Sequence, residues 1–310
     1  MTGGKSRFAS GPFAGETLDK AWSEMPPEWT GTRANLGEAF PLLVKFILAE
    51  EKLSVQVHPN DDYASRHERK AGGRGKTEMW YALRARPGAE VLVGLKSSVT
   101  REQFQRAIAD GTAENCLEHI PLRPGDAVFV PAGTAHTIGP GLVLCEIQQN
   151  SDLTYRVYDY NRRDAQGRAR ELHIDKALDV MRFGQQIGEK VEPVRVQRGP
   201  LTETHFAACR YFATVQWEFA ERIDAATSRE HFDLLIFLEG IGSIQWGADR
   251  AEYAPAQVWL MPAALGDFRL APHSRTSLLR TFVPGDMNEL GRRLTEQGVA
   301  EVDWSRLVHR

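Results

Sequence analysis

The stretch Leu53-Ser54-Val55-Gln56-Val57-His58-Pro59 decides the fold of this chain. Side chains on a β-strand alternate between its two faces, so Ser54, Gln56 and His58 point one way and the two valines point the other. A buried amide or imidazole needs partners that offset the loss of its hydration. We therefore expect this strand to turn one face to a polar site and the other to an apolar core.

Three later stretches each place a potential metal ligand or a charge on or beside a strand. Two imidazoles, one carboxylate and one amide oxygen form a ligand set that suits a divalent ion, usually zinc, with a position left for substrate. Any one of these residues alone is more often an ordinary core or surface side chain, but four together favour a metal site. The three stretches are Gly75-Lys76-Thr77-Glu78-Met79-Trp80-Tyr81, Val130-Pro131-Ala132-Gly133-Thr134-Ala135-His136, and Glu146-Ile147-Gln148-Gln149-Asn150-Ser151 running on to Tyr155-Arg156-Val157-Tyr158-Asp159-Tyr160.

These stretches resemble the signatures of type I mannose-6-phosphate isomerase (phosphomannose isomerase), a family of the cupin superfamily. The resemblance covers residues 8–160, where order and spacing both fit, and it is weak beyond. The phrases that carry it are Phe40-Pro41-Leu42-Leu43-Val44-Lys45-Phe46, Ser54-Val55-Gln56-Val57-His58-Pro59, Gly75-Lys76-Thr77-Glu78, Pro131-Ala132-Gly133-Thr134-Ala135-His136 and Glu146-Ile147-Gln148-Gln149-Asn150-Ser151.

The resemblance implies an aldose–ketose isomerase that interconverts mannose 6-phosphate and fructose 6-phosphate with one Zn²⁺ per chain. It implies zinc ligands at Gln56, His58, Glu78 and His136, and a catalytic arginine at Arg156. Members of the family usually carry several more strands ahead of the lead-in formed here by residues 1–34, including an early Trp and Glu motif, and we do not find them in this sequence. We therefore expect an unpaired sheet edge beside the first barrel.

The remaining site residues follow from what the reaction requires. A proton must move between neighbouring carbons, and Glu146 is our candidate for that transfer because its strand lies close to the strand of His136. Lys76, two residues before Glu78, is expected to bind substrate, while Ser54 and Arg162 are expected to help hold its phosphate.

Lys45 is a further candidate phosphate contact. It interrupts the apolar run of residues 40–48, which has the composition of a buried strand. A lysine in such a run is costly unless its ammonium meets an anion. The alternative is that the long side chain simply reaches the rim of the barrel.

Composition bounds the class of protein. The chain has 310 residues, 42% of them hydrophobic, and a formal charge of -3, which gives no basic field for nucleic acid or an anionic membrane. Its three cysteines are odd in number and form no Cys-x-x-Cys pair, which suits a reducing cytoplasm. No apolar run is long enough to span a membrane, and the first residues carry no signal-peptide core. We expect a cytoplasmic enzyme that works as a monomer on a small sugar phosphate.

The pattern predicts a mainly β chain of two cupin-like, jelly-roll barrels. We expect residues 1–195 to form the metal-binding catalytic barrel, and the charged segment 61–75 to be an exposed loop. A helical insertion is predicted near residues 99–117, because Thr100 and Gln103 form a capping box ahead of Phe104.

The last third resembles a degraded repeat of the first barrel. The stretch Val258-Trp259-Leu260-Met261-Pro262-Ala263 resembles Val128-Phe129-Val130-Pro131-Ala132-Gly133. By this alignment Leu234 falls near the position of Glu78, and Asp267 falls at that of His136. Residues 196–310 are therefore predicted to form a second barrel without metal, closed by a helix over residues 286–297.

Two other functions remain open on the sequence. One is a cupin that binds a sugar or sugar phosphate without turnover. The other is a metal-dependent oxygenase or epimerase, since cupin folds host many chemistries. The usual three-histidine and glutamate shell of those enzymes is not what Gln56 and His58 offer.

Overall fold

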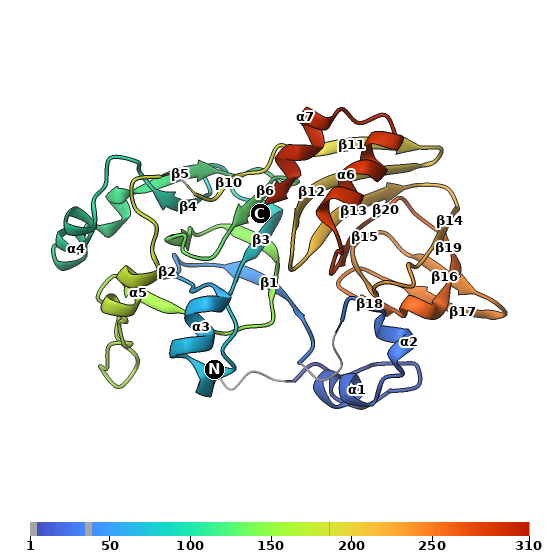
Figure 1. Ribbon diagram of the computed structural model, residues 1–310, viewed down its shortest axis with the longest axis horizontal. Coiled ribbons are helices and arrows are strands. Elements are labelled where there is room, and N and C mark those ends of the chain that lie inside the picture. Colours follow the sequence, from blue (N-terminus) through green and yellow to red (C-terminus); the bar gives the residue numbers. More distant parts are fainter. Residues whose placement is uncertain (1–4, 35–38, 186, 310) are drawn as a thin grey trace. The chain divides into compact units, whose positions relative to one another are not determined.

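The computed structural model describes residues 5–34, 39–185 and 187–309, and it is mainly β as predicted (Figure 1). The chain divides into two compact units, which are described separately. Leu42–Val191 forms what we call the central unit. Met1–Pro41 together with Glu192–Arg310 forms the terminal unit.

The central unit contains two five-stranded antiparallel sheets. We call them sheet A, with strand order β1-β8-β3-β6-β10, and sheet B, with order β5-β4-β7-β2-β9. Sheet A consists of β1 (Leu42–Ala49), β8 (Leu142–Gln149), β3 (Glu78–Ala85), β6 (Ala127–Val130) and β10 (Glu189–Lys190). Sheet B consists of β5 (Leu117–Pro121), β4 (Glu90–Leu95), β7 (His136–Ile138), β2 (Val55–Val57) and β9 (Tyr155–Tyr158).

The terminal unit repeats this plan. The segment β13-β20-β15-β18 of its larger sheet has the same arrangement as β1-β8-β3-β6 of sheet A. The larger sheet consists of β11 (Val194–Arg198), β12 (Leu201–Cys209), β13 (Ala213–Phe219), β20 (Thr276–Phe282), β15 (Asp233–Glu239) and β18 (Val258–Met261), with β21 (Val308–His309) beside β12. The smaller sheet consists of β14 (Ile223–Ala226), β19 (Asp267–Pro272), β16 (Gly242–Trp246) and β17 (Asp249–Tyr253).

Short helices border the sheets. The central unit has α3 (Asp61–His67), α4 (Arg101–Ala109) and α5 (Ile174–Val180), with 3₁₀ turns η1 (Arg69–Ala71) and η2 (Ala113–Cys116). The terminal unit has α1 (Leu18–Glu24), α2 (Pro27–Thr30), α6 (Met287–Glu296) and α7 (Glu301–Trp304), with 3₁₀ turns η3 (Ala263–Leu265) and η4 (Ser305–Leu307). The predicted C-terminal helix is α6, and the side chain of Asp286 caps it by accepting from the Asn288 amide.

Alternation on β2 separates the two environments of the central unit. Val55 and Val57 are fully buried in a cluster with Phe104 of α4 and Leu178 of α5, on the outer side of sheet B. A second apolar cluster draws residues from both sheets, among them Leu144 of β8 and Val93 of β4. The polar residue of β2, Gln56, faces this interior between the sheets, so the predicted two-sided strand is present, although the regular strand covers only three residues.

The predicted helical insertion is α4, which Figure 1 shows as an excursion beside β4 and β5. Thr100 and Gln103 form the expected capping box, in which each side chain bonds the other's backbone amide. Phe104 is fully buried, and a phenylalanine removed from water in this way contributes about 2 kcal/mol, roughly twice the worth of a cap.

The prediction of an exposed loop over residues 61–75 was wrong. The segment begins with helix α3, because the Asn60 side chain accepts a hydrogen bond from the Tyr63 amide and two aspartates favour the first turn. Ala64, on the inner face of the helix, is fully buried. The many charged residues were read as a loop, but they form the solvent-exposed face of a capped helix.

The segment ahead of residue 42 belongs to the terminal unit, whereas the sequence analysis placed it with the first barrel. The reason is an aromatic cluster that spans the unit. Trp22 of α1 lies 5.0 Å from Phe40 and 5.5 Å from Phe232, measured between ring centroids. Edge-to-face contacts of this kind add stabilisation beyond the area they bury. Residues 35–38, between these partners, lie outside the described residues.

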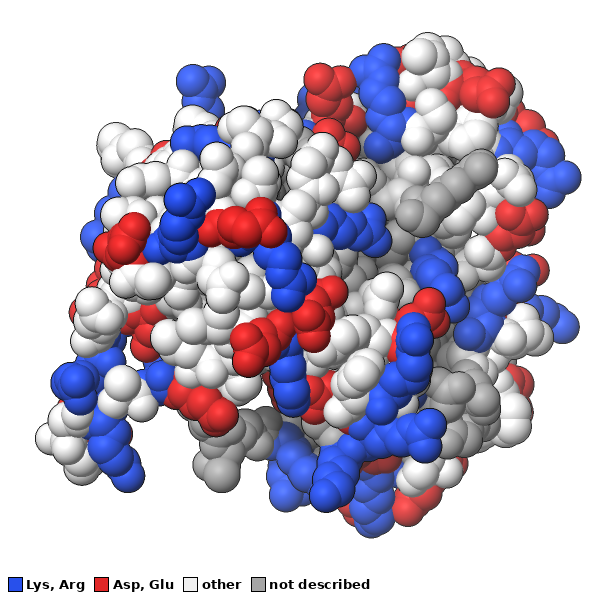
Figure 2. Space-filling model, turned by 60° about the vertical axis from the view of Figure 1, so that its left-hand side comes forward, with Lys and Arg blue, Asp and Glu red and all other residues white. Residues whose placement is uncertain are grey.

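On the face shown in Figure 2, basic side chains are intermixed with acidic ones. No helix in the described part of the chain is long and apolar enough to cross a membrane.

The cap of α4 gives a stability test. Thr100→Ala should lower the free energy of unfolding by about 1 kcal/mol and speed amide exchange in the first turn of α4, because the Gln103 amide loses its acceptor. Thr100→Ser should preserve both properties. Urea unfolding and hydrogen exchange measure them, and wild-type behaviour of Thr100→Ala would contradict the capping assignment.

Candidate metal centre and substrate site

Strand pairing in sheet B brings three of the predicted residues into one row. Gln56 on β2 lies directly opposite His136 on β7 and opposite Arg156 on β9. Directly opposed residues on neighbouring strands send their side chains to the same face. The amide, the imidazole and the guanidinium therefore share the face that looks into the interior of the central unit.

Sheet A supplies the carboxylate. Glu78 opens β3, and its Oε1 lies 3.3 Å from His136 Nε2 while its Oε2 lies 3.6 Å from His58 Nε2. One ligand atom from each of the three residues lies within 4.8 Å of the others, and all three side chains are buried. Among the residues that the structure describes, these three are the only group of His, Cys, Asp or Glu side chains close enough together to hold a metal ion.

Backbone carbonyls orient both imidazoles. His58 Nδ1 lies 2.7 Å from the Leu153 carbonyl oxygen, and His136 Nδ1 lies 2.9 Å from that of Thr134. A ring that donates from Nδ1 leaves the Nε2 lone pair free, which is the arrangement of a metal-binding histidine. Burial lowers the pKa of His136 to about 4, and burial with the nearby Lys76 ammonium holds that of His58 well below its usual value. Both rings are therefore neutral at pH 7, as metal ligands must be.

Lys76 balances the charge of Glu78. Its Nζ lies 2.8 Å from Glu78 Oε2 and 3.1 Å from His58 Nε2. Burial by itself lowers the pKa of Lys76, but the carboxylates of Glu78 and Glu146 outweigh it and raise that pKa. Neither Glu78 oxygen accepts a hydrogen bond of normal geometry within the described part of the chain. A fully buried carboxylate in this condition is costly, and a metal ion would satisfy it.

The amide of Gln56 completes the set. Its Nε2 lies 3.2 Å from His136 Nε2, and rotation of the amide exchanges its nitrogen with its oxygen. Two neutral imidazoles, a carboxylate and an amide oxygen are borderline-to-hard donors that fit zinc. The residues present thus fit the predicted ion.

Glu146 lies on the same interior face as Glu78. It is buried on β8, opposite Trp80 of β3 and Lys45 of β1. The Trp80 Nε1–H donates to its Oε1 over 3.1 Å, and Lys45 Nζ lies 3.5 Å from its Oε2. Burial and then the Glu78 charge raise the pKa of Glu146, as a group that exchanges protons requires.

The ammonium of Lys45 lies close to anions, as we expected for a lysine within an apolar strand. In the structure the anions are Glu146 and the exposed Asp152, whose Oδ1 lies 3.7 Å away, and Lys45 Nζ also donates to Gln148 Oε1 over 3.0 Å. The ammonium is partly exposed at the edge of the interior. A phosphate here would compete with these carboxylates.

Arg156 is half-buried and is held by neutral groups. Its Nε donates to Ser54 Oγ over 3.3 Å and its Nη1 donates to the Glu171 carbonyl over 3.1 Å. Within the described residues it forms no ion pair, so the surface pairing with Asp152 or Asp159 that could have made it a purely structural residue does not occur. Ser54, also a predicted site residue, therefore positions the guanidinium.

Arg162 is engaged elsewhere. Its Nη2 lies 2.5 Å from Asp159 Oδ1, and its Nη1 donates to the Lys52 carbonyl over 2.6 Å. Asp159 also pairs with Arg170. Arg162 thus belongs to a cluster around Asp159, and no contact in the described structure joins it to His58, Glu78 or His136.

Sequence reasoning missed two residues of this centre, Trp80 and Gln148. Trp80 donates to Glu146, and its ring packs edge-on against His136 at 5.3 Å between centroids. Gln148 accepts from Lys45. Each lies two residues beyond a predicted site residue, Glu78 or Glu146, so the period of two on a strand could have indicated them.

The register of the terminal unit corrects one assignment. Glu78 pairs with the residue before Pro131, and it is Asp233 that pairs with Met261, the residue before Pro262. Asp233, and not Leu234, therefore occupies the position of Glu78. The sequence alignment was therefore displaced by one residue. On a strand, such a displacement places the wrong side chain on the interior face. Asp267 opens β19 as His136 opens β7, but it is exposed.

The fold and the buried group of His58, Glu78 and His136 define a protein of the cupin class with a candidate metal site. Comparison with known proteins gives the family. The catalytic domain of type I phosphomannose isomerase matches residues 2–85. The "Probable mannose-6-phosphate isomerase GmuF" of Bacillus subtilis is 39% identical over 86% of this chain and 82% of its own length. The chain belongs to the family of type I mannose-6-phosphate isomerases, as the sequence predicted.

Solved structures agree. The mannose 6-phosphate isomerase from Bacillus subtilis superposes with a TM-score of 0.82 at 31% identity, covering 90% of this chain and 85% of that one. A zinc-bound mannose 6-phosphate isomerase shares the fold at a TM-score of 0.68 and 17% identity, covering 87% of this chain and 86% of that one.

Removal of single imidazoles tests the metal centre. His58→Ala and His136→Ala should each lose most of the bound metal, because each deletes a neutral nitrogen donor from the buried group. His273→Ala, at an exposed histidine of the terminal unit, is the matched control and should retain it. Elemental analysis of the purified variants measures this, and equal metal content in all three would contradict the assignment.

Proposed function

We propose that the chain is a zinc-dependent isomerase that interconverts mannose 6-phosphate and fructose 6-phosphate, with one zinc ion per chain. The observation that carries the proposal is the buried group of His58, Glu78 and His136, in register with Arg156, inside a member of this family. Gln56 is proposed as the fourth ligand. Zinc held by these residues would supply a Lewis acid for the substrate's carbonyl and neighbouring hydroxyl.

Arg156 is proposed to stabilise negative charge that develops on the substrate oxygens. Its guanidinium shares a face with Gln56 and His136, and Ser54 fixes its orientation. Because the group has no carboxylate partner in the described structure, its charge is available to substrate. A preoriented cation in a site shielded from water stabilises such charge more than one in bulk solvent does.

Glu146 is proposed to move the proton between neighbouring carbons. Its raised pKa brings the acid and base forms closer in free energy near neutral pH, and Trp80 fixes one oxygen. Lys45, 3.5 Å from the other oxygen, can stabilise the carboxylate when it is formed.

The phosphate and hydroxyl contacts are proposed for Lys76, Lys45, Ser54 and Arg162. Support is strongest for Lys76, whose ammonium lies in the centre, and for Ser54, which contacts Arg156. Arg162 would have to leave Asp159 to reach a ligand.

We further propose that the chemistry is confined to the barrel of the central unit, that the second barrel holds no metal, and that the enzyme acts as a monomer in the cytoplasm. The free thiols of Cys116, Cys145 and Cys209 support a reducing compartment.

A coupled assay tests the reaction itself. Purified protein should convert mannose 6-phosphate to fructose 6-phosphate, should lose most activity after chelation, and should regain it with one equivalent of zinc. Saturable binding of fructose 6-phosphate without turnover would replace the proposal with a sugar-phosphate-binding cupin. Full activity in metal-free protein would exclude the zinc-dependent mechanism.

Substitution of Arg156 tests its role. Arg156→Ala should lower kcat by about a hundredfold or more with zinc content and fold unchanged, because the lost interaction forms in the transition state. Arg156→Lys should restore little, since an ammonium cannot reproduce the planar fork.

The matched control is Arg163→Ala, which removes an exposed arginine of the same unit that donates to the Gly167 carbonyl. It should leave kcat and KM unchanged. A raised KM with normal kcat in Arg156→Ala would reassign Arg156 to phosphate binding, and wild-type rates would remove it from the site.

A further inference from the structure

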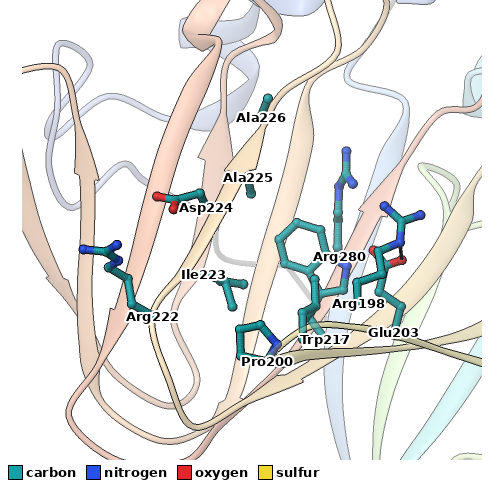
Figure 3. Close-up of a pocket in the computed structure, with 11 residues that line it drawn as sticks. Arg198, Pro200, Glu203, Trp217, Arg222, Ile223, Asp224, Ala225, Ala226 and Arg280 are labelled. Carbon is teal, nitrogen blue, oxygen red and sulfur yellow. Dashed lines mark ion pairs between the residues drawn. The ribbon is translucent and has the colours of Figure 1, made fainter.

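The terminal unit contains a cavity of about 340 Å³ between its larger sheet and β14, drawn in Figure 3. This volume is sufficient for a small metabolite. Its lining combines an aromatic ring with several arginines, and includes Arg198, Leu201, Glu203, Trp217, Ile223 and Arg280. None of these residues belongs to the site proposed for isomerisation.

Strand pairing shows that Arg280, which lines this cavity, has the same position in its sheet as Glu146 has in sheet A. Arg280 of β20 lies opposite Leu235 of β15, just as Glu146 of β8 lies opposite Trp80 of β3. A cation therefore occupies the place where the central unit has a carboxylate. The equivalent position in the terminal unit has reversed its charge.

Arg280 is held in place but is not fully satisfied. Its Nη2 lies 2.9 Å from Asp233 Oδ2, and its guanidinium carbon lies 5.1 Å from the Trp217 ring and 5.2 Å from that of Phe282. Its Nε is buried and has no hydrogen-bond partner among the described residues. The indole Nε1 of Trp217, a side chain only 3% exposed, is in the same condition.

The acidic groups around the cavity already lie against cations. Glu203 Oε2 lies 2.8 Å from Arg198 Nε, Asp224 Oδ1 accepts from Arg269 Nε over 2.7 Å, and Asp233 pairs with Arg280. The cavity lining therefore contains two buried N–H donors without acceptors, one of them on a guanidinium, and one buried carboxylate oxygen, Glu203 Oε2, which faces Arg198 but accepts no hydrogen bond of normal geometry among the described residues. Buried donors without acceptors are costly, and a ligand oxygen would satisfy them.

We propose that this cavity is a second ligand site, which binds a small metabolite through an oxyanion group, a phosphate or a carboxylate. Arg280 and Trp217 donate to the oxyanion, and Leu201 and Ile223 contact the apolar part of the molecule. Guanidinium groups suit both oxyanions because their planar donor fork matches paired oxygens. The proposal is independent of the isomerase reaction.

Fluorine NMR of protein labelled with 5-fluorotryptophan can report on both sites at once. The chain has seven tryptophans, and Trp→Phe variants assign the signals. The Trp217 signal reports the cavity, the Trp80 signal reports the centre of the central unit, and the Trp259 signal is the control. Trp259 lies in the terminal unit, where its indole donates to Gln257 Oε1 over 3.0 Å. The probes are inorganic phosphate and malonate, with chloride at matched ionic strength.

Either probe should shift the Trp217 signal saturably at millimolar concentration, without moving that of Trp259. A response to phosphate alone would identify the ligand as a phosphate compound, and a response to malonate alone as a carboxylate. Arg280→Lys keeps a charge for Asp233 but removes the Nε–H, and should weaken binding about tenfold. Arg250→Lys, at an exposed arginine paired with Glu252, should bind as wild type does.

Three results would overturn the proposal. They are a Trp217 signal that neither probe moves, a shift that chloride reproduces, and a shift of Trp80 alone, which would place the anion only in the central unit. Undiminished binding in Arg280→Lys would remove Arg280 from the site. Trp217→Phe, which keeps an aromatic ring but deletes the indole N–H, gives a second variant whose affinity for the responding probe should also fall in calorimetry.

Discussion

The burial of the Glu78 carboxylate is the constraint on which the central unit depends. A fully buried carboxylate without partners would cost far more than the stability of an ordinary domain can tolerate. In the structure, Lys76, His58 and His136 all lie close to its two oxygens. Because Lys76 and the neutral imidazoles satisfy it only in part, the group retains a capacity for a cation. The need to stabilise this buried carboxylate and its proposed role as a metal ligand therefore have the same physical origin.

The polar site in the central unit is possible because two apolar clusters lie next to it, one behind sheet B and one between the two sheets. The valines of β2 stabilise sheet B from outside, against α4 and α5, and a separate cluster joins the two sheets. The helical insertion thus does more than lengthen a connection, since Phe104 covers the back of the strand that presents Gln56. A strand with a polar inner face needs this outer cover, and the amphipathic helix supplies it.

The terminal unit shows how one strand order can support different interiors. The four strands β1-β8-β3-β6, which carry Glu78 and Glu146 in the central unit, recur in the terminal unit, but there Asp233 stands at the position of Glu78 and Arg280 at that of Glu146. The backbone fixes where side chains meet, while the residues at those points fix which charge the interior can accept. Two units of one chain can therefore share topology without sharing chemistry.

The sequence by itself determined the mainly β class, the family and the two-sided character of residues 53–59, since these follow from alternation and from motifs of fixed order. It also determined the capping box of α4, which involves neighbouring residues alone. Only the tertiary structure decided that Lys76 lies between Glu78 and His58, that Arg162 pairs with Asp159, and that Asp233 takes the position of Glu78. Pairing register and the meeting of two sheets depend on contacts between distant segments, which no local pattern encodes. For the same reason the segment before residue 42, which the sequence analysis placed in the first barrel, is assigned by its aromatic contacts with Phe232 to the unit that ends the chain.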